Sequence, residues 1–172
     1  SKGTVAINPP KIYQENFNNH KTSAKLNWLK INNKSNNDSL ITNSFDIATI
    51  GNDNWGDLVL ECRIRQMPTV ANEKRNGWFG IGKNGMRVLL RPKHISYCLP
   101  KVSETVLLQL PQPFHSKKWL QLRVVFSGSE ALVFVDGHPL GTIRNIPAGA
   151  GRITLQQHQT KCEIDDIKVT LL

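Results

Sequence analysis

The sequence contains few cysteines, and their number and spacing argue against a disulfide scaffold. Cys62, Cys98 and Cys162 are the only three in 172 residues. An odd number leaves at least one thiol unpaired, and no C-x-x-C pair indicates a thiolate zinc site or a redox pair. Each cysteine lies in an apolar, strand-like stretch, where a buried free thiol is the simplest interpretation.

Long hydrophobic runs and helical periodicity are also missing. No apolar run approaches the roughly 20 residues that a membrane-spanning helix requires, so we expect no membrane insertion. No charged segment followed by an apolar one opens the chain at Ser1, which indicates nothing about export by itself. No stretch combines a sustained 3.6-residue period with capping residues, so the sequence predicts little or no helix.

Acidic residues are scarce beside basic ones. The chain carries 22 Lys and Arg against 13 Asp and Glu, a formal net charge of +9. This surplus fits an anionic partner, such as an acidic glycan, a cell-wall polymer or nucleic acid. It fits a well-solvated basic surface equally well, because no basic run of five or more residues is present. Nucleic acid is the less favoured partner, since a basic helix, a zinc finger and an aromatic RNA-recognition signature are all missing.

Short segments in which apolar and polar side chains alternate are abundant, and they predict β-strands. The clearest is 57–66, which places one set of side chains on each face: Leu58, Leu60, Cys62 and Ile64 on the first, Val59, Glu61, Arg63 and Arg65 on the second. Asn84-Gly85 predicts a hairpin turn between strands at 76–83 and 86–91, because both residues tolerate positive φ. Other strands are expected at 25–31, 45–50, 119–126, 130–136, 140–143, 152–158 and 162–171.

The strand pattern predicts an all-β fold. We expect residues 1–11 to form an extended lead-in and residues 12–172 a single two-sheet antiparallel sandwich. The Asn-rich tract 32–39 is expected to be a surface loop. Trp28 and Trp119 are expected in the core.

The C-terminal third resembles a known group of jelly rolls. The segments that carry the resemblance are KWLQLRVV (118–125), ALVFVDG (131–137), GRITL (151–155) and EIDDIKV (163–169). Their order is similar to the W-x-x-L-x-V, V-x-V-D-G, G-x-I-x-L and F-D-D-V-x-V pattern of concanavalin A-like and laminin G-like jelly rolls. Among these it resembles the bacterial 3-keto-disaccharide hydrolase-type domains and levan-binding modules. The middle of the chain, with NGWFGI at 76–81, fits the same group.

The resemblance does not decide whether the protein is an enzyme, but the residues at the expected catalytic positions argue against catalysis. Related β-glucan hydrolases carry E-x-D-x-x-E on one strand, with the carboxylates as nucleophile and acid. Here Glu163 and Asp165 begin such a motif, but Lys168 replaces the final acid. The hypothesis of a 3-keto-glycoside hydrolase depends on Glu61 as an acid, but Arg63 occupies the position at which a second acid is expected.

The same resemblance suggests a structural calcium ion. In many relatives the C-terminal acids help to hold calcium, which would assign that role to Asp165 and Asp166, joined by Asp53 or Asp57. The alternative is that one aspartate caps a bulge and the other faces water. Apart from this calcium, no cofactor is expected.

A polar surface is the strongest candidate for ligand binding. Glu61, Arg63 and Arg65 share one face of a strand, and Arg87 and Arg91 share a face of another. Trp78 alternates with Gly80 and Gly82, which would leave an aromatic ring over bare backbone, suited to stacking on a sugar. The alternative is that Trp78 points into the core and the arginines are solvated.

Trp55, in the loop 52–56, is a further candidate for ligand binding or for a lid over the sheet edge. The favoured function is an exported, extracellular carbohydrate-binding or adhesion-type module with an anionic or neutral polysaccharide ligand. The alternatives are a glycoside-processing enzyme of the 3-keto-disaccharide hydrolase-like group and a protein-interaction or sensor domain of laminin G type.

Overall fold

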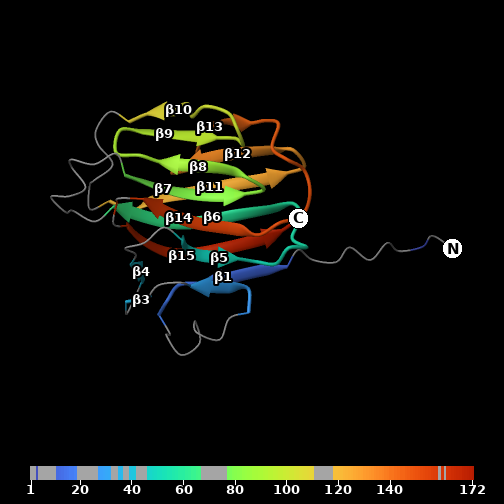
Figure 1. Ribbon diagram of the computed structural model, residues 1–172. Coiled ribbons are helices and arrows are strands. Elements are labelled where there is room, and N and C mark those ends of the chain that lie inside the picture. The colour runs from blue at the N-terminus through green and yellow to red at the C-terminus, as the bar shows by residue number, and fades with distance from the viewer. Residues whose placement is uncertain are drawn as a thin grey trace.

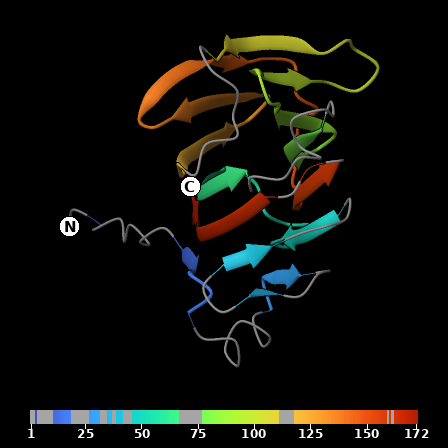
Figure 2. The same ribbon diagram turned by 90° about the vertical axis from the view of Figure 1, so that its left-hand side faces the viewer.

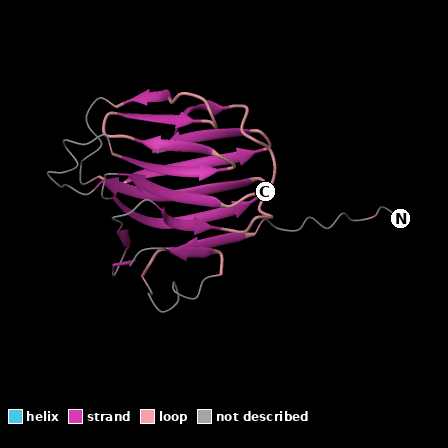
Figure 3. Ribbon diagram, in the orientation of Figure 1, coloured by secondary structure: helices cyan, strands magenta, loops and turns pink. Residues whose placement is uncertain are grey.

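The computed structural model consists of two antiparallel β-sheets packed face to face (Figure 1). It describes residues 3, 11–18, 27–31, 35–36, 39–41, 46–66, 77–110, 118–158, 160 and 162–172. Within these ranges every regular element is a strand and none is a helix, so none could be a membrane-spanning helix (Figure 3). The predicted all-β sandwich is therefore confirmed.

Each sheet is built from strands that are distant in the sequence. Sheet 1 runs in the order β13 (His138–Ile143), β12 (Glu130–Val135), β11 (Leu120–Ser127), β6 (Leu58–Gln66), β15 (Cys162–Leu171), β4 (Ser39–Ile41) and β3 (Ser35–Asn36), with β1 (Ile12–Glu15) also paired to β15. Sheet 2 runs in the order β10 (Thr105–Gln109), β9 (His94–Cys98), β8 (Met86–Leu90), β7 (Trp78–Lys83), β14 (Ile153–His158), β5 (Asp46–Ile50) and β2 (Leu29–Ile31). Figure 2 shows the two layers from the side, with β12 and β13 in orange facing the green and yellow strands of sheet 2.

The core lies between the sheets and follows from the alternation of side chains. Leu58, Leu60, Cys62 and Ile64 of β6 are each at most 1% exposed. The facing strands of sheet 2 contribute equally buried side chains, among them Phe79, Ile81, Val88, Ile153 and Leu155. Because successive strand residues point to opposite faces, burying one set presents the other set on the outer surface. The inward face predicted for 57–66 is the observed one.

The β7–β8 hairpin has the turn that its sequence predicts. Asn84 and Gly85 have φ angles of 52° and 84°. Positive φ at both central residues is the type I′ geometry, whose twist matches that of the two flanking strands. Asp136 and Gly137 join β12 and β13 with the same pair of positive angles, 50° and 79°.

The structure also contains strands that the sequence did not predict. β10 was not predicted, and β9 was recognised only as a strand-like stretch around Cys98, without bounds. The tract 32–39 is not entirely a loop, because Ser35 pairs with Leu40 and Asn36 with Ser39 at the edge of sheet 1. An edge hairpin can form through backbone hydrogen bonds alone, so it leaves little apolar pattern in the sequence.

Candidate functional site

The predicted site residues lie on two separate surfaces. Glu61, Arg63 and Arg65 belong to β6 in sheet 1, whereas Trp78 and Arg87 belong to β7 and β8 in sheet 2. Since the sheets pack through their inner faces, their outer faces point in opposite directions (Figure 2). The structure therefore does not bring the two groups into one site.

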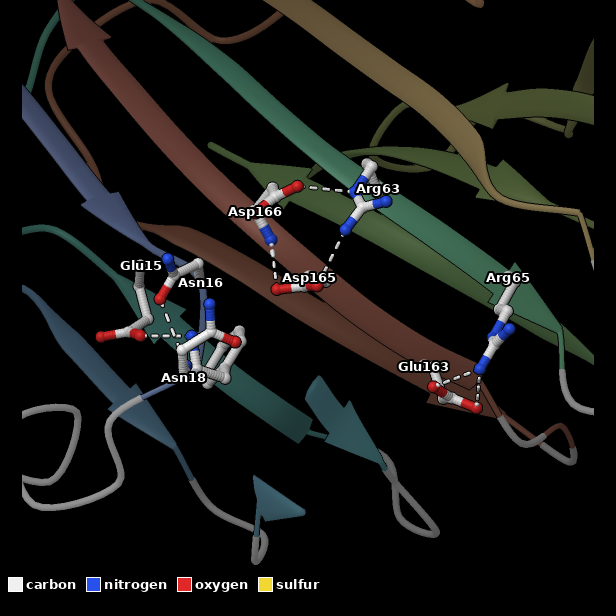
Figure 4. A network of polar contacts seen from close by, with 9 residues as sticks. Glu15, Asn16, Asn18, Arg63, Arg65, Glu163, Asp165 and Asp166 are labelled. Carbon is white, nitrogen blue, oxygen red and sulfur yellow. Dashed lines mark hydrogen bonds and ion pairs between the residues drawn. The ribbon is translucent and has the colours of Figure 1, made fainter. Parts of the chain in front are cut away.

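On sheet 1 the charged side chains of β6 are matched by opposite charges on β15. Arg65 donates to both carboxylate oxygens of Glu163, at 3.0 and 2.9 Å (Figure 4). Arg63 lies 3.0 Å from Asp165 and 2.6 Å from Asp166. Glu61 in turn lies 4.0 Å from Lys168 Nζ, and 3.9 Å from Arg123 on the other side.

A β-bulge keeps these charges on one face. The register between β15 and β6 shifts between Asp165 and Lys168, and Asp166 adopts a φ of 48°. The Asp166 amide donates to Asp165 Oδ1 at 2.7 Å, which closes the bulge. Burial, the largest influence, raises the pKa of Asp165; the hydrogen bond from the Asp166 amide and the charge of Arg63 oppose it, and the charge of Asp166 adds to it. The expectation that one aspartate caps a bulge describes this geometry.

Trp119 is not a core residue, which corrects the sequence prediction. The guanidinium carbons of Arg63 and Arg65 lie 4.9 and 4.6 Å from its ring centroid. Its neighbour Leu120 pairs with Ile64 of β6, which puts the indole on the outer face of sheet 1. Arg63 and Arg65 are therefore held both by carboxylates and by an aromatic ring, an arrangement that stabilises the sheet and leaves them little freedom to bind a ligand.

A depression of about 640 Å³ lies beside this row of charges. Its lining combines amides, carboxylates and one ammonium group, from Gln14, Glu15, Asn16, Glu61, Gln121, Asp166, Ile167 and Lys168. No aromatic side chain is among these lining residues. A sugar could be hydrogen-bonded here, but it would find no ring on which to stack.

The acids expected to hold calcium do not fit a calcium site. Asp165 and Asp166 both face the Arg63 guanidinium, whose positive charge takes the place that a cation would need. Asp53 instead pairs with Arg152 at 2.7 Å, and Asp57 accepts a hydrogen bond from the Gly128 amide at 2.8 Å. Across the described part of the chain, no three His, Cys, Asp or Glu side chains gather in a group able to hold a metal ion.

On sheet 2 the Trp78 ring lies against bare backbone. A Cβ atom added to Gly80 would come within 2.9 Å of the indole, so only glycine leaves room for the ring in this position. The guanidinium carbon of Arg87 lies 5.5 Å from the Trp78 ring centroid. The His158 ring lies 6.0 Å away, tilted by 34°. The alternation predicted for Trp78, Gly80 and Gly82 is thus observed, with the indole on the outer face.

Arg87 and Arg91 differ in their electrostatic surroundings. Arg91 donates to both oxygens of Glu104, at 2.6 and 2.7 Å, and Ser96 donates to the same carboxylate. These contacts, led by the Arg91 hydrogen bond, lower the pKa of Glu104 to about 2. No carboxylate of the described residues, by contrast, is within ion-pair distance of Arg87 (the ion pairs found all involve other cations).

A second depression, of about 340 Å³, is lined in part by Arg87, whose guanidinium contacts the Trp78 ring. Its lining comes from the β7–β8 hairpin and from β14: Gly82, Lys83, Asn84, Gly85, Met86, Arg87, Arg152, Thr154 and Gln156. Gln156 pairs with Gly80, the residue that the indole covers, and Thr154 pairs with Gly82. The ring, the guanidinium and these polar side chains therefore form one continuous surface, which we call the Trp78 surface.

Trp55 is largely buried, and it also lines a depression of about 350 Å³ at the end of the sandwich. It is 5% exposed, and its ring centroid lies 4.8 Å from that of Tyr13. The ring covers Gly51, where a Cβ atom would come within 2.3 Å of it. Both roles considered for Trp55, ligand binding and a lid over the sheet edge, stay predictions. Trp28, 6% exposed, is in the core as predicted.

Sequence reasoning missed the contribution of β14 to the Trp78 surface. Thr154, Gln156 and His158 lie more than 70 residues from Trp78 in the sequence and reach it only through strand pairing. Their alternation within 152–158 was visible, but nothing in the sequence showed which strand would lie beside them.

Comparisons with known proteins were made by sequence and by structure. No family model matches the sequence, and no curated protein is similar enough in sequence to be identified as a relative. The carbohydrate recognition domain of Emp47p superposes with a TM-score of 0.67 at 12% identity, covering 95% of this chain and 97% of that one. The fold is a concanavalin A-like jelly roll.

Two other jelly rolls show how broadly this architecture is used. The Crh5 transglycosylase superposes with a TM-score of 0.65 at 9% identity, over 95% of this chain and 88% of that one. The carbohydrate-binding module CBM66 of Bacillus subtilis gives 0.56 at 12% identity, over 84% and 96%. Binding proteins and enzymes share the jelly roll, so the function must be argued from the site.

Proposed function

We propose that this protein is a non-catalytic carbohydrate-binding module that binds a glycan on the Trp78 surface. The observation that carries the proposal is the Trp78 ring, half-buried on the outer face of sheet 2 against the bare backbone of Gly80. An indole held in this way is a preformed apolar plane, and the C–H face of a sugar ring packs against such a plane.

Polar groups around the ring supply the directional contacts that a sugar needs. Thr154 and Gln156 lie beside the indole, and their hydroxyl and amide groups both donate and accept hydrogen bonds. Arg87 adds a planar set of donors. Glycan-binding domains with this fold, such as the recognition domain of Emp47p and CBM66, support the proposal as relatives in architecture. A polysaccharide ligand would place the protein outside the cytoplasm.

The chemistry of both outer faces argues against hydrolysis. Two-carboxylate hydrolysis requires an acid and a nucleophile or base facing one substrate. Among the lining residues of the depression on the Trp78 surface there is no carboxylate. On sheet 1, Lys168 replaces the last acid of the hydrolase motif. The carboxylates that line the depression there are already engaged, Glu61 and Asp166 with cations and Glu15 with a backbone amide.

The test is affinity electrophoresis of the wild-type protein and of Trp78→Ala through gels containing a panel of neutral and acidic polysaccharides. We expect the wild type to be retarded by at least one polysaccharide and Trp78→Ala to bind it about tenfold or more weakly, a loss of roughly 1.4 kcal/mol. Trp119→Ala is the matched control, because it removes a half-buried indole from the opposite face. Circular dichroism checks that both variants are folded.

Four outcomes would contradict the proposal. The first is no retardation on any polysaccharide, and the second is loss of binding in Trp119→Ala with full binding in Trp78→Ala. The third is capture of a glycoprotein that persists after complete deglycosylation, which would indicate a protein-interaction domain. Turnover of a 3-keto-glycoside that disappears in Glu61→Gln would indicate an enzyme acting at the depression on sheet 1.

A further inference from the structure

We propose that the glycan bound on the Trp78 surface is acidic, and that Arg87 binds its carboxylate or sulfate group. This inference rests on the proposed function and specifies the ligand class and the residue that recognises it. Three features of the molecule carry it: the use of its acids, the surroundings of its arginines and the position of Arg87.

The acidic side chains are already engaged within the protein. Every carboxylate whose side-chain surroundings are described has either a cation or a backbone amide as its partner. The partners are cations for Asp53, Glu61, Glu104, Glu130, Glu163, Asp165 and Asp166, and backbone amides for Glu15, Asp57 and Asp136. Within the described residues, these acids are therefore not available to neutralise a cation that lies elsewhere on the surface.

Arg87 differs from the other arginines in this respect. Seven arginines belong to the described part of the chain, and six of them lie within 4.0 Å of a carboxylate: Arg63, Arg65, Arg91, Arg123, Arg144 and Arg152. Arg87 is the seventh, and its described contact is with the Trp78 ring. A guanidinium near an aromatic face keeps the N–H groups in its own plane available, and these match the two oxygens of a carboxylate or sulfate.

The position of Arg87 favours a ligand that uses both the charge and the ring. Arg87 pairs with Gly82 on one side and with Cys98 on the other, so no long side chain on its nearest paired neighbours covers it. It lines the depression that Thr154 and Gln156 also line. Because the guanidinium lies over the Trp78 ring, a pyranose stacked there would present its substituents to Arg87. An anionic group would gain an ion pair with two parallel hydrogen bonds, which a single hydroxyl cannot form.

The experiment compares polymers that differ in charge and little else. The first pair is polygalacturonate and its methyl ester, which tests a carboxylate. The second pair is carrageenan and its desulfated form, which tests a sulfate. We expect the wild-type protein to bind the acidic member of at least one pair more tightly, by about 10- to 100-fold, and more weakly as the salt concentration rises. Whichever pair responds identifies the anionic group.

Two arginine substitutions assign that preference to a residue. Arg87→Gln is expected to abolish the preference for the acidic polymer, because it removes the charge and the paired donors. Arg144→Gln is the matched control: it makes the same charge change on an exposed arginine that directly follows β13, 70% accessible and paired with Glu130. It should bind like the wild type. Thermal denaturation of both variants verifies the fold.

The possible failures are distinguishable. If Trp78→Ala removes binding but Arg87→Gln leaves the acidic preference intact, the proposed function stands and this inference is overturned. If the acidic and neutral members of both pairs bind equally well and Trp78 is still required, the proposed function also stands and this inference is overturned. If no polymer binds, both proposals fall. If Arg144→Gln and Arg87→Gln weaken binding equally, the attraction is a property of net charge, and the inference is again overturned.

Discussion

Among the arginines, identical side chains take different roles because their neighbours differ. Arg63 and Arg65 are each neutralised by a carboxylate about a hundred residues away in the sequence, and Arg91 is neutralised by Glu104, in the loop just before β10. Arg87 has an aromatic ring instead. An ion pair that is half-buried and bidentate fixes a guanidinium and stabilises the fold, whereas a guanidinium that lacks a carboxylate retains its capacity to bind an external anion.

At the same scale, the Glu104–Arg91 pair predicts a pH-dependent contribution to stability. The pKa of Glu104 is lowered from 4.5 to about 2, so folding favours the ionised form. The stabilisation is complete above about pH 4.5 and is lost as the pH falls through about 2. Glu104→Gln should therefore lower the free energy of unfolding by about 1–2 kcal/mol at pH 7, a value limited by the partial exposure of the pair.

Urea unfolding between pH 7 and pH 2 measures this effect. The difference between the wild type and Glu104→Gln should shrink steadily below pH 4.5. Glu130→Gln is the control, because its pair with Arg144 is largely exposed and should contribute less than about 1 kcal/mol. A difference that stays constant down to pH 2 would show that the charge of Glu104 is unimportant for folding.

Among the elements, the β7–β8 hairpin links the fold to the candidate site. The hairpin turn fixes the register that sets Gly82 opposite Arg87 and Gly80 opposite Leu89. Since a shift by one residue would turn every outward side chain inward, the Trp78 surface depends on this turn. The bulge at Asp166 acts in the same way on sheet 1, where it keeps Lys168 opposite Glu61.

For this element we predict that Gly85→Ala destabilises the protein more than Gly128→Ala. Both glycines have positive φ, 84° and 58°, which costs an alanine about 1 kcal/mol. At Gly85 the new Cβ would also come within 2.8 Å of Pro100 Cγ, whereas at Gly128 no atom lies within 4 Å. Chemical denaturation should show a further loss of about 1 kcal/mol or more for Gly85→Ala. Equal losses would mean that Pro100 moves aside freely.

In the whole molecule, two-layer packing separates one buried interior from two outward faces of different character. Sheet 1 presents a row of paired charges, and sheet 2 presents the Trp78 surface. The three cysteines, which form no disulfide, differ in whether they lie in the interior or on an outer face. Cys62 and Cys162 are enclosed between the layers, and burial raises the pKa of each thiol to about 12. Cys98 is half-buried on the outer face of sheet 2, opposite Arg87.

At this scale we predict that Ellman's reagent at pH 8 labels one thiol per native chain and three per unfolded chain. The thiolate is the reactive form, so the two buried thiols should react only when the sandwich opens. Cys98→Ser should leave the native protein unlabelled, which assigns the reactive thiol. A saturating glycan should slow the labelling of Cys98 if it covers Arg87. Rapid labelling of all three native thiols would contradict the packing described above.

The sequence supported some features of this protein and not others, depending on how local their causes are. Alternation within β6 correctly predicted which side chains are buried, and Asn84-Gly85 correctly predicted the turn. Trp119 has the same local pattern as a core residue, yet it lies on the surface between two arginines of another strand. Alternation separates the side chains of a strand into two faces, but it does not show which face packs against the other sheet.

By itself, the sequence determined the strand periodicity, the turns and a surplus of positive charge, because each depends on neighbouring residues or on composition alone. Only the tertiary structure decided which of those charges remain unpaired. Glu163 and Asp165 meet Arg65 and Arg63 across about a hundred residues of chain, and Gln156 meets Trp78 in the same way. Such meetings are fixed by the pairing of strands into sheets, and that pairing is a choice among many partners that no single segment specifies.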